Sequence, residues 1–226
     1  MSRTSKVHTP KPFEVNDAQA IKTLIAEHPL ATWINYSERG IVINHIPFVF
    51  HSNVGDQGVL RGHIAKANSV WHDLEEECLT AAVFQGPQTY ISPSWYVSKA
   101  EHGKVVPTWN YMVVHVHGQQ RFITDPKWIL EQLNSLTDQQ EKTHLQPWNV
   151  ADAPETYTQR LLKGIVGVEI TITKIDATWK TSQNKSKQDQ QSVIRALQSV
   201  GSDQAKEMAI AIKTNGQKFK VLPNRN

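Results

Sequence analysis

The sequence predicts an α+β fold that is mainly β. Short runs of β-branched and aromatic residues recur between residues 31 and 84, and turn-forming residues separate them, as in a β-meander. Two long extended segments follow, at residues 111–122 and 165–179. Clear helical periodicity is confined to the start of the chain, the stretch between these two segments, and the end.

The first half of the chain is expected to hold one helix and four strands. The helix begins after Asn16 or Asp17 and stops before Pro29, with apolar residues at helical spacing between them. A short helical insert follows Asn68, a candidate N-cap, and separates the third strand from the fourth. The expected strands are residues 31–35, 41–50, 59–64 and 79–84.

The second half is expected to begin with the strand at residues 111–122. Proline in the first turn favours helix starts at residues 124–126 and 153–155, and Gly164 ends the second of these helices. Apolar residues alternate in the strand at 165–179, which predicts one buried face. Two polar helices are expected beyond Asn184, at residues 186–200 and 202–214.

The composition is that of a globular protein. A hydrophobic content of 39% in 226 residues is enough for a sizeable core, in one large domain or two small ones. No apolar run approaches the roughly 18 residues of a membrane span, and the first residues lack the apolar segment of a secretory signal. We therefore expect a cytoplasmic protein without a membrane partner. Cys78 is the only cysteine, which excludes an intrachain disulfide, and we expect it to fill the core.

The charge balance gives weak support to DNA as a partner. The net charge is +3, from 24 Lys and Arg against 21 Asp and Glu, and the basic residues are scattered. The densest basic groups, at residues 180–187 and 213–220, lie near the end of the chain and are typical of solvated faces.

The segment at residues 91–118 combines aromatic rings with hydrogen-bond donors. Pro93 and Pro107 bias the residues before them away from helix, so the segment should leave one strand and enter another. Trp95 and Trp109 are therefore candidates to cover a ligand, since binding residues concentrate on such loops. Large aromatic residues are also common core or interface anchors, and that alternative stays open.

A second candidate segment is residues 60–68. If it is a strand that ends in a turn, Arg61 and His63 lie on one face and Lys66 lies at the turn. The backbone amides after Asn68 would then open a helix and favour an anion. Exposed basic residues without a ligand are the simpler interpretation of the same pattern.

The amino-acid sequence of several segments resembles that of the PaiB-type FMN-binding transcriptional regulator family. The resemblance extends over about residues 12–184. It implies a flavoprotein with an FMN-binding split β-barrel and peripheral helices. This fold is similar to that of the pyridoxamine-phosphate oxidases. The resemblance also implies a homodimer with FMN between the chains. Residues 1–184 would form the flavin-binding domain and residues 185–226 a C-terminal helical extension. The segments that carry the resemblance are residues 60–68, 84–87, 90–96, 106–111 with His115, 165–170 and 180–184.

The resemblance also implies which residues contact FMN. Those carried over are His63, Ile64, Lys66 and Asn68 on the strand and turn, Trp95, Trp109 and Asn110 on the covering segment, and Lys180, Ser182, Gln183 and Asn184 after the last strand. Arg61 joins the first group. His45 stands where the wider fold often has a phosphate-binding arginine, and a histidine packed against the neighbouring strand is an equally open alternative. Ser69 and Thr181 depart from the family, which has proline and an aliphatic residue there.

Three functions remain open at this point. The family implies an FMN-binding repressor of transcription, although no convincing helix-turn-helix is present. A flavin-dependent oxidoreductase or oxidase is the first alternative, and no catalytic residue can be assigned. A haem-binding or haem-degrading protein is the second, with His63, His115 or another histidine as axial ligand. His115 and His117 share a strand face without a third ligand, so we expect no metal site there.

Overall fold

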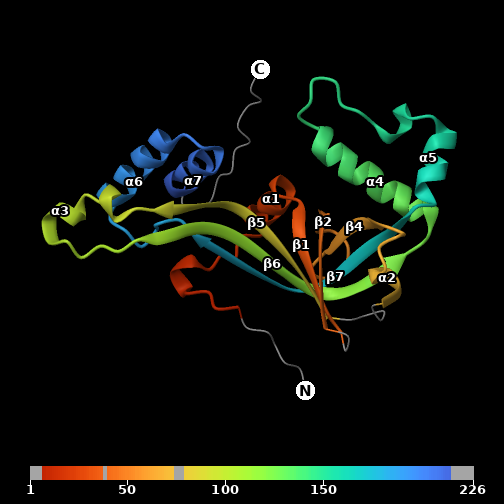
Figure 1. The fold of residues 1–226 in the computed structure, drawn as a ribbon, viewed down its shortest axis with the longest axis horizontal. Helices are drawn as coiled ribbons and strands as arrows, with labels where there is room; N and C mark the ends of the chain where they lie inside the picture. Colours follow the sequence, from red (N-terminus) through yellow and green to blue (C-terminus); the bar gives the residue numbers. More distant parts are fainter. Residues whose placement is uncertain (1–6, 38–39, 74–78, 215–226) are drawn as a thin grey trace. The chain divides into compact units, whose positions relative to one another are not determined.

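The computed structural model describes residues 7–37, 40–73 and 79–214. Within them, a seven-stranded sheet has the order β2-β1-β5-β6-β7-β4-β3 (Figure 1). None of the helices in these ranges is long and apolar enough to cross a membrane. The strands are β1 Leu30–Ser37, β2 Gly40–Pro47, β3 Val49–His51, β4 Val59–Ala65, β5 Leu79–Ile91, β6 Thr108–Ile123 and β7 Ile165–Lys180.

Backbone contacts divide the chain into two compact units. Unit 1 takes in the described residues of the ranges 1–24, 85–114 and 176–222, and unit 2 those of 25–84 and 115–175. Strands β5, β6 and β7 run through both units, whereas β1 to β4 belong to unit 2.

Unit 2 has a core between the strands and helix α4. Antiparallel pairing joins β1 to β2, β1 to β5, β3 to β4 and β4 to β7. Trp33, Phe48 and Phe84 are fully buried in this core. Asp125 caps helix α4 by accepting the amides of Lys127 and Trp128, and α4 packs on β4. The helices of this unit are α2 Val70–Asp73, α4 Pro126–Glu141, η3 Val150–Asp152 and α5 Glu155–Leu162.

Unit 1 carries the remaining helices. Helices α6 and α7 lie side by side (Figure 1) and are joined by Gly201, whose φ of 75° suits glycine, and by Ser202, which caps α7. The Gln204 side chain on α7 accepts the Gln88 backbone amide of β5 at 2.9 Å. The elements are η1 Lys11–Phe13, α1 Ala18–Glu27, which reaches into unit 2, η2 Pro93–Trp95, α3 Ser98–His102, α6 Lys187–Val200 and α7 Asp203–Lys213.

The structure confirms the expected strands and helices and changes several boundaries. The strand expected at 41–50 is interrupted at Phe48, and the one expected at 79–84 continues to Ile91. β1 pairs with β5 over residues 80–83, so Pro87 lies beyond this pairing and its missing N–H costs no bond to β1. The predicted crossing from one strand to another after Pro93 is confirmed, but it also contains η2 and α3. Cys78, expected in the core, lies outside the described residues.

Candidate functional site

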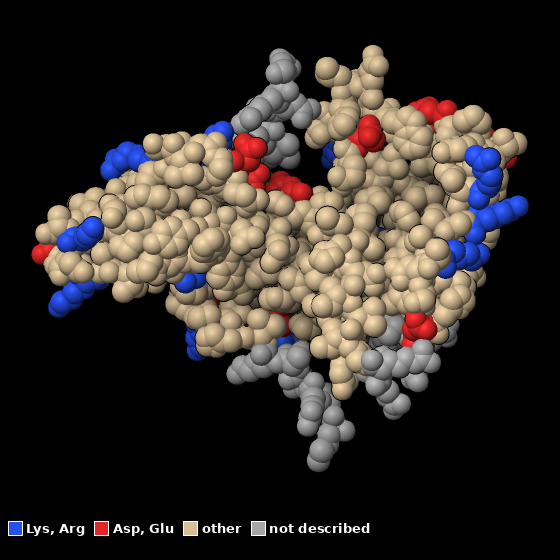
Figure 2. Space-filling model, viewed as in Figure 1, with Lys and Arg blue, Asp and Glu red and all other residues tan. Residues whose placement is uncertain are grey.

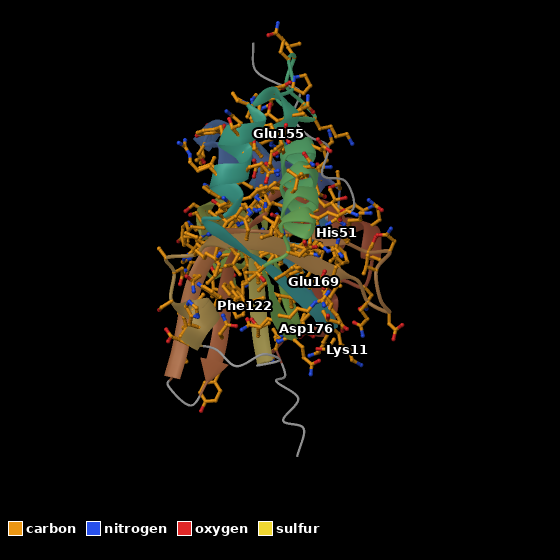
Figure 3. All side chains as sticks on the ribbon, turned by 90° about the vertical axis from the view of Figure 1, so that its right-hand side faces the viewer. Lys11, His51, Phe122, Glu155, Glu169 and Asp176 are labelled. Carbon is orange, nitrogen blue, oxygen red and sulfur yellow. The ribbon has the colours of Figure 1, made fainter. Side chains whose placement is uncertain are left out.

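Unit 2 contains a buried carboxylate that binds two arginine side chains next to β4. Glu169 on β7 is 3% exposed and lies opposite Arg61 in the β4–β7 register. Its Oε2 accepts from Arg61 Nε at 2.8 Å, and its Oε1 accepts from Arg121 Nη2 at 2.6 Å. In Figure 3 Glu169 is labelled on β7, below α4 in that view. Because a buried carboxylate needs charged partners, the two guanidinium groups make this burial tolerable.

Helix α4 covers this side of the β4–β7 pair. The Arg61 guanidinium lies 5.3 Å from the centre of the Trp128 ring, and His63 Nδ1 is 2.8 Å from Gln132 Oε1. Gly167 lies opposite His63, and a Cβ there would stand 2.3 Å from the Trp128 ring. Arg61 and His63 therefore share one face, as expected, and that face contacts α4.

The turn after β4 is held by side chains that were expected to contact a ligand. Asn68 donates from Nδ2 to Asn44 Oδ1 at 2.8 Å and accepts the Val70 amide on Oδ1 at 3.1 Å. The Lys66 carbonyl accepts from Trp71 Nε1 at 2.9 Å, while the Lys66 side chain is exposed. Because α2 is described over only four residues and its first amide is already bonded, Lys66 is the stronger anion-binding group of this turn.

Ile64 of the first group and His45, named separately from it, have different surroundings. Ile64 points into the core and is 4% exposed. His45 is exposed on β2, opposite Thr32 of β1, so its side chain lies on the solvent side of the sheet and is not packed in the core.

The second group of expected residues lies in unit 1. Trp109 is 48% exposed, and its ring meets Tyr90 edge to face with centroids 6.2 Å apart. Asn110 Nδ2 donates to Ser182 Oγ at 2.8 Å, and Lys180 Nζ donates to Thr108 Oγ1 at 2.7 Å. This pair of bonds ties the start of β6 to the end of β7.

The turn after β7 has unusual backbone geometry. Ser182 is buried with φ of 59°, a conformation that non-glycine residues adopt mainly where surrounding contacts impose it. Gln183 closes the turn by accepting the Thr181 amide at 2.7 Å, and Gln190 Nε2 donates to the Ser182 carbonyl at 3.1 Å. Asn184 follows as an exposed residue.

An anchor between the aromatic segment and α6 was not anticipated. The buried Asp189 carboxylate accepts from Ser98 Oγ at 2.9 Å and from the Ser98 amide at 3.1 Å. Burial acts to raise the pKa of Asp189, but hydrogen bonds from Ser98 and Ser186 outweigh it, so the net pKa is lowered. Burial raises the pKa of Tyr96, and the Asp189 charge adds to this effect. Trp95, in η2 just before Tyr96, is half-buried.

Each unit, taken by itself, carries groups whose chemistry suits one part of a mononucleotide flavin. The exposed Lys66 ammonium of unit 2 suits a phosphate, and the exposed Trp109 and Tyr90 rings of unit 1 suit an aromatic ring system. The described residues contain no group of three or more His, Cys, Asp and Glu placed to hold a metal ion. The chemistry present in unit 2 therefore fits an oxyanion, and that in unit 1 fits an aromatic ring system.

The family comparison agrees with this chemistry. A family described as "Putative FMN-binding domain" matches residues 7–174. The chain belongs to this FMN-binding family, and FMN is its cofactor. The match confirms the resemblance noted in the sequence.

Individual relatives cover most of the chain. It is 32% identical over 203 residues to "Protease synthase and sporulation protein PAI 2" of Bacillus subtilis, covering 90% of this chain and 95% of the relative. It is 34% identical over 206 residues to an uncharacterized protein of Emericella nidulans, covering 77% and 82%.

Solved structures show the same fold at low identity. The FAD and haem binding protein from Mycobacterium smegmatis has a TM-score of 0.56 at 16% identity, covering 74% of this chain and 73% of that one. The flavocytochrome Anf3 from Azotobacter vinelandii has a TM-score of 0.53 at 14% identity, covering 79% and 74%. The fold is the split β-barrel, as expected from the sequence.

Proposed function

We propose that this protein is an FMN-binding homodimer of the PaiB type that represses transcription in the cytoplasm. The observation that carries the proposal is the similarity to PAI 2, which extends over 95% of a relative named for protease synthesis and sporulation. A cofactor without an assigned catalytic residue is compatible with a sensing role.

An apolar sheet face supports the homodimer. Cross-strand partners point to the same side of a sheet, and the β1–β2 register pairs Tyr36 with Ile41 and Ile34 with Ile43. Tyr36, Ile41 and Ile43 are 72%, 67% and 56% exposed. Because β2 is also an edge strand, this face is exposed on its flat side and along its edge. Apolar surface of this kind marks an association site, and a second copy of the chain is the occupant we propose.

The FMN contacts follow the two groups of residues described above. We assign Arg61, His63 and Lys66 to the phosphate end, with Asn68 and Ile64 holding the turn and strand that present them. His45 stays an alternative phosphate contact. Trp95, Trp109 and Asn110 are assigned to the ring system, and Lys180, Ser182, Gln183 and Asn184 to the flavin of the partner chain. Residues 1–184 form the flavin-binding part and residues 185–226 the extension.

Direct reading of DNA by the last helices has little support. α7 begins with Asp203 and carries Glu207, both of which would repel phosphate groups. Its apolar side is already buried. The visible face in Figure 2 shows basic and acidic side chains interspersed, with a small basic group in unit 2 beside α5. We therefore propose that the flavin state acts on transcription through another partner.

A charge reversal at Lys66 tests the proposal. Lys66→Glu places a carboxylate against the FMN phosphate and should lower FMN affinity at least tenfold, whereas Lys142→Glu, the same change at an exposed position just after α4, should not. In the native host, Lys66→Glu should reproduce the transcript changes caused by deleting the gene. Transcript levels that do not respond to deletion would contradict the regulatory role.

A flavin-dependent redox enzyme is the second candidate. Two structural neighbours are named as a FAD and haem binding protein and a flavocytochrome. His63 also has its Nδ1 held by Gln132, an arrangement that orients a histidine for metal ligation through its other nitrogen. Absorbance spectra after addition of haem, and flavin reduction by a nicotinamide donor, distinguish this candidate from a sensor.

A further inference from the structure

Helix α4 of unit 2 carries two buried polar atoms that nothing in the described structure satisfies. Trp128 Nε1 and Gln132 Nε2 are buried and have no hydrogen-bond partner among the described residues. Gln132 as a whole is 2% exposed. A buried donor without an acceptor has lost the hydrogen bond that it makes to water in the unfolded chain, so two such donors one helical turn apart indicate a bound group.

The two donors lie over neighbouring cross-strand residue pairs of β4 and β7. Gln132 contacts His63, and the Trp128 ring packs on Gly167, the residue opposite His63. The next pair on this face is Arg61 opposite Glu169, and the Arg61 guanidinium lies against the same Trp128 ring. The donors, one turn apart on α4, therefore belong to the same cluster as the charged residues.

The cluster has more donors than acceptors. Glu169 is its one carboxylate in the described structure, and both of its oxygens already accept from Arg61 and Arg121. Two guanidinium groups against one carboxylate leave an excess of positive charge. The Arg121 side chain is 60% exposed, so one of these cations can be reached from solvent. A group that satisfies this cluster must bring acceptor oxygens and negative charge.

The orientation of the Gln132 amide strengthens this conclusion. One end of the amide is engaged by His63 Nδ1, so the other end lacks a partner whichever way the amide is turned. Trp128 has no such ambiguity because an indole nitrogen only donates.

We propose that this cluster, formed by Trp128, Gln132, Arg61 and Arg121, binds an oxyanion, specifically a phosphate group. The phosphate has two sources, the 5′-phosphate of FMN or free inorganic phosphate. With FMN as the source, the inference rests on the proposed FMN contacts and adds α4 to them. With inorganic phosphate as the source, it is a separate anion site.

Matched substitutions on α4 test the proposal. Gln132→Met removes the polar end and keeps the size of the side chain, and Gln140→Met makes the same change at an exposed position of the same helix. Trp128→Phe removes the second donor while an aromatic ring still covers Gly167, and it serves if Gln132→Met fails to fold. FMN and riboflavin affinities are measured by flavin fluorescence. The melting temperature is measured in phosphate and in chloride at equal ionic strength.

Each outcome decides the question. A loss of about tenfold in FMN affinity for Gln132→Met, with riboflavin affinity unchanged, supports the FMN phosphate as the bound group. Loss of the phosphate-induced stabilisation, with FMN affinity unchanged, supports inorganic phosphate. If Gln132→Met and Trp128→Phe both behave like Gln140→Met in every measurement, the proposed site is overturned and the two donors are assigned to water. Failure of the parent to bind FMN and riboflavin would contradict the cofactor assignment separately, because the phosphate measurement does not depend on flavin.

Discussion

At the scale of single residues, Gly167 permits the close approach of α4 to the sheet. Its Cα lies under the Trp128 ring, and an added Cβ would stand 2.3 Å from Trp128 Cζ3 and 2.8 Å from Cε3. Because the ring is also held against Arg61, it has little freedom to move aside. The absence of a side chain at this position therefore matters for the Arg61–Glu169–Arg121 cluster as well.

We predict that Gly167→Ala destabilises the protein by about 2 kcal/mol, the usual cost of overpacking. Urea denaturation measures this change. In a Trp128→Ala background the clash disappears, so the same substitution should then cost little. An equal cost in both backgrounds would show that the contact with Trp128 is not the cause.

Residue spacing predicted part of this cluster. Alternation along residues 60–68 placed Arg61 and His63 on one face, and the structure confirms this by their contacts with α4. Gln132 and Glu169 were not predicted, because they are distant in sequence and meet β4 only through tertiary packing. A glutamate within a strongly apolar run at residues 165–170 was the one available signal, since such a residue needs a buried partner.

At the scale of elements, α6 holds the aromatic segment between β5 and β6. Asp189 of α6 accepts from Ser98 of α3, and Lys185, two residues before α6, has its ammonium 4.9 Å from the centre of the Tyr96 ring. Gln190 of the same helix bonds the turn at Ser182. The start of α6 therefore contacts both segments of unit 1 to which flavin contacts are assigned.

Replacing Asp189 by Ala should destabilise the protein by about 2 kcal/mol, because Ser98 loses a charged acceptor in a buried place. Asp203→Ala, at an exposed position in the same unit, is the control and should change stability by less than about 0.5 kcal/mol. Urea denaturation of both variants makes the comparison.

The pH dependence follows from the lowered pKa of Asp189. A carboxyl group whose pKa is lower in the folded state stabilises the protein above its unfolded pKa, about 3.9, and loses this contribution as pH falls through the folded pKa. The stability difference between parent and Asp189→Ala should therefore be constant near neutral pH and shrink in acid. A difference that grows on acidification would contradict the assignment.

Sequence patterns predicted the elements better than their ends. Caps and proline positions gave α4, α5, α6 and α7 to within a few residues. The extension of β5 past Gly86 and Pro87 was missed, because both residues are typical of turns. At Pro87 the pairing of β5 with β1 has already ended, so the missing N–H costs no bond to β1. That fact belongs to the sheet and cannot be read from local sequence.

At the scale of the whole molecule, the exposed face of β1 and β2 is the surface to which we assign self-association. Ile43→Glu places a charge in the middle of this face and should convert the dimer to a monomer. Leu161 on α5 is similarly exposed, so Leu161→Glu is the matched control and should leave the assembly unchanged. Sedimentation velocity measures both variants, and an Ile43→Glu protein that sediments as the parent does would remove this face from the interface.

The most direct test of the account is sedimentation velocity of the purified chain with added FMN, followed at a wavelength that only the flavin absorbs. The account predicts that flavin sediments with a species of twice the 25.6 kDa chain mass, at one FMN per chain. A folded dimer that leaves all the flavin behind in the supernatant, or flavin carried by a monomer, would contradict it.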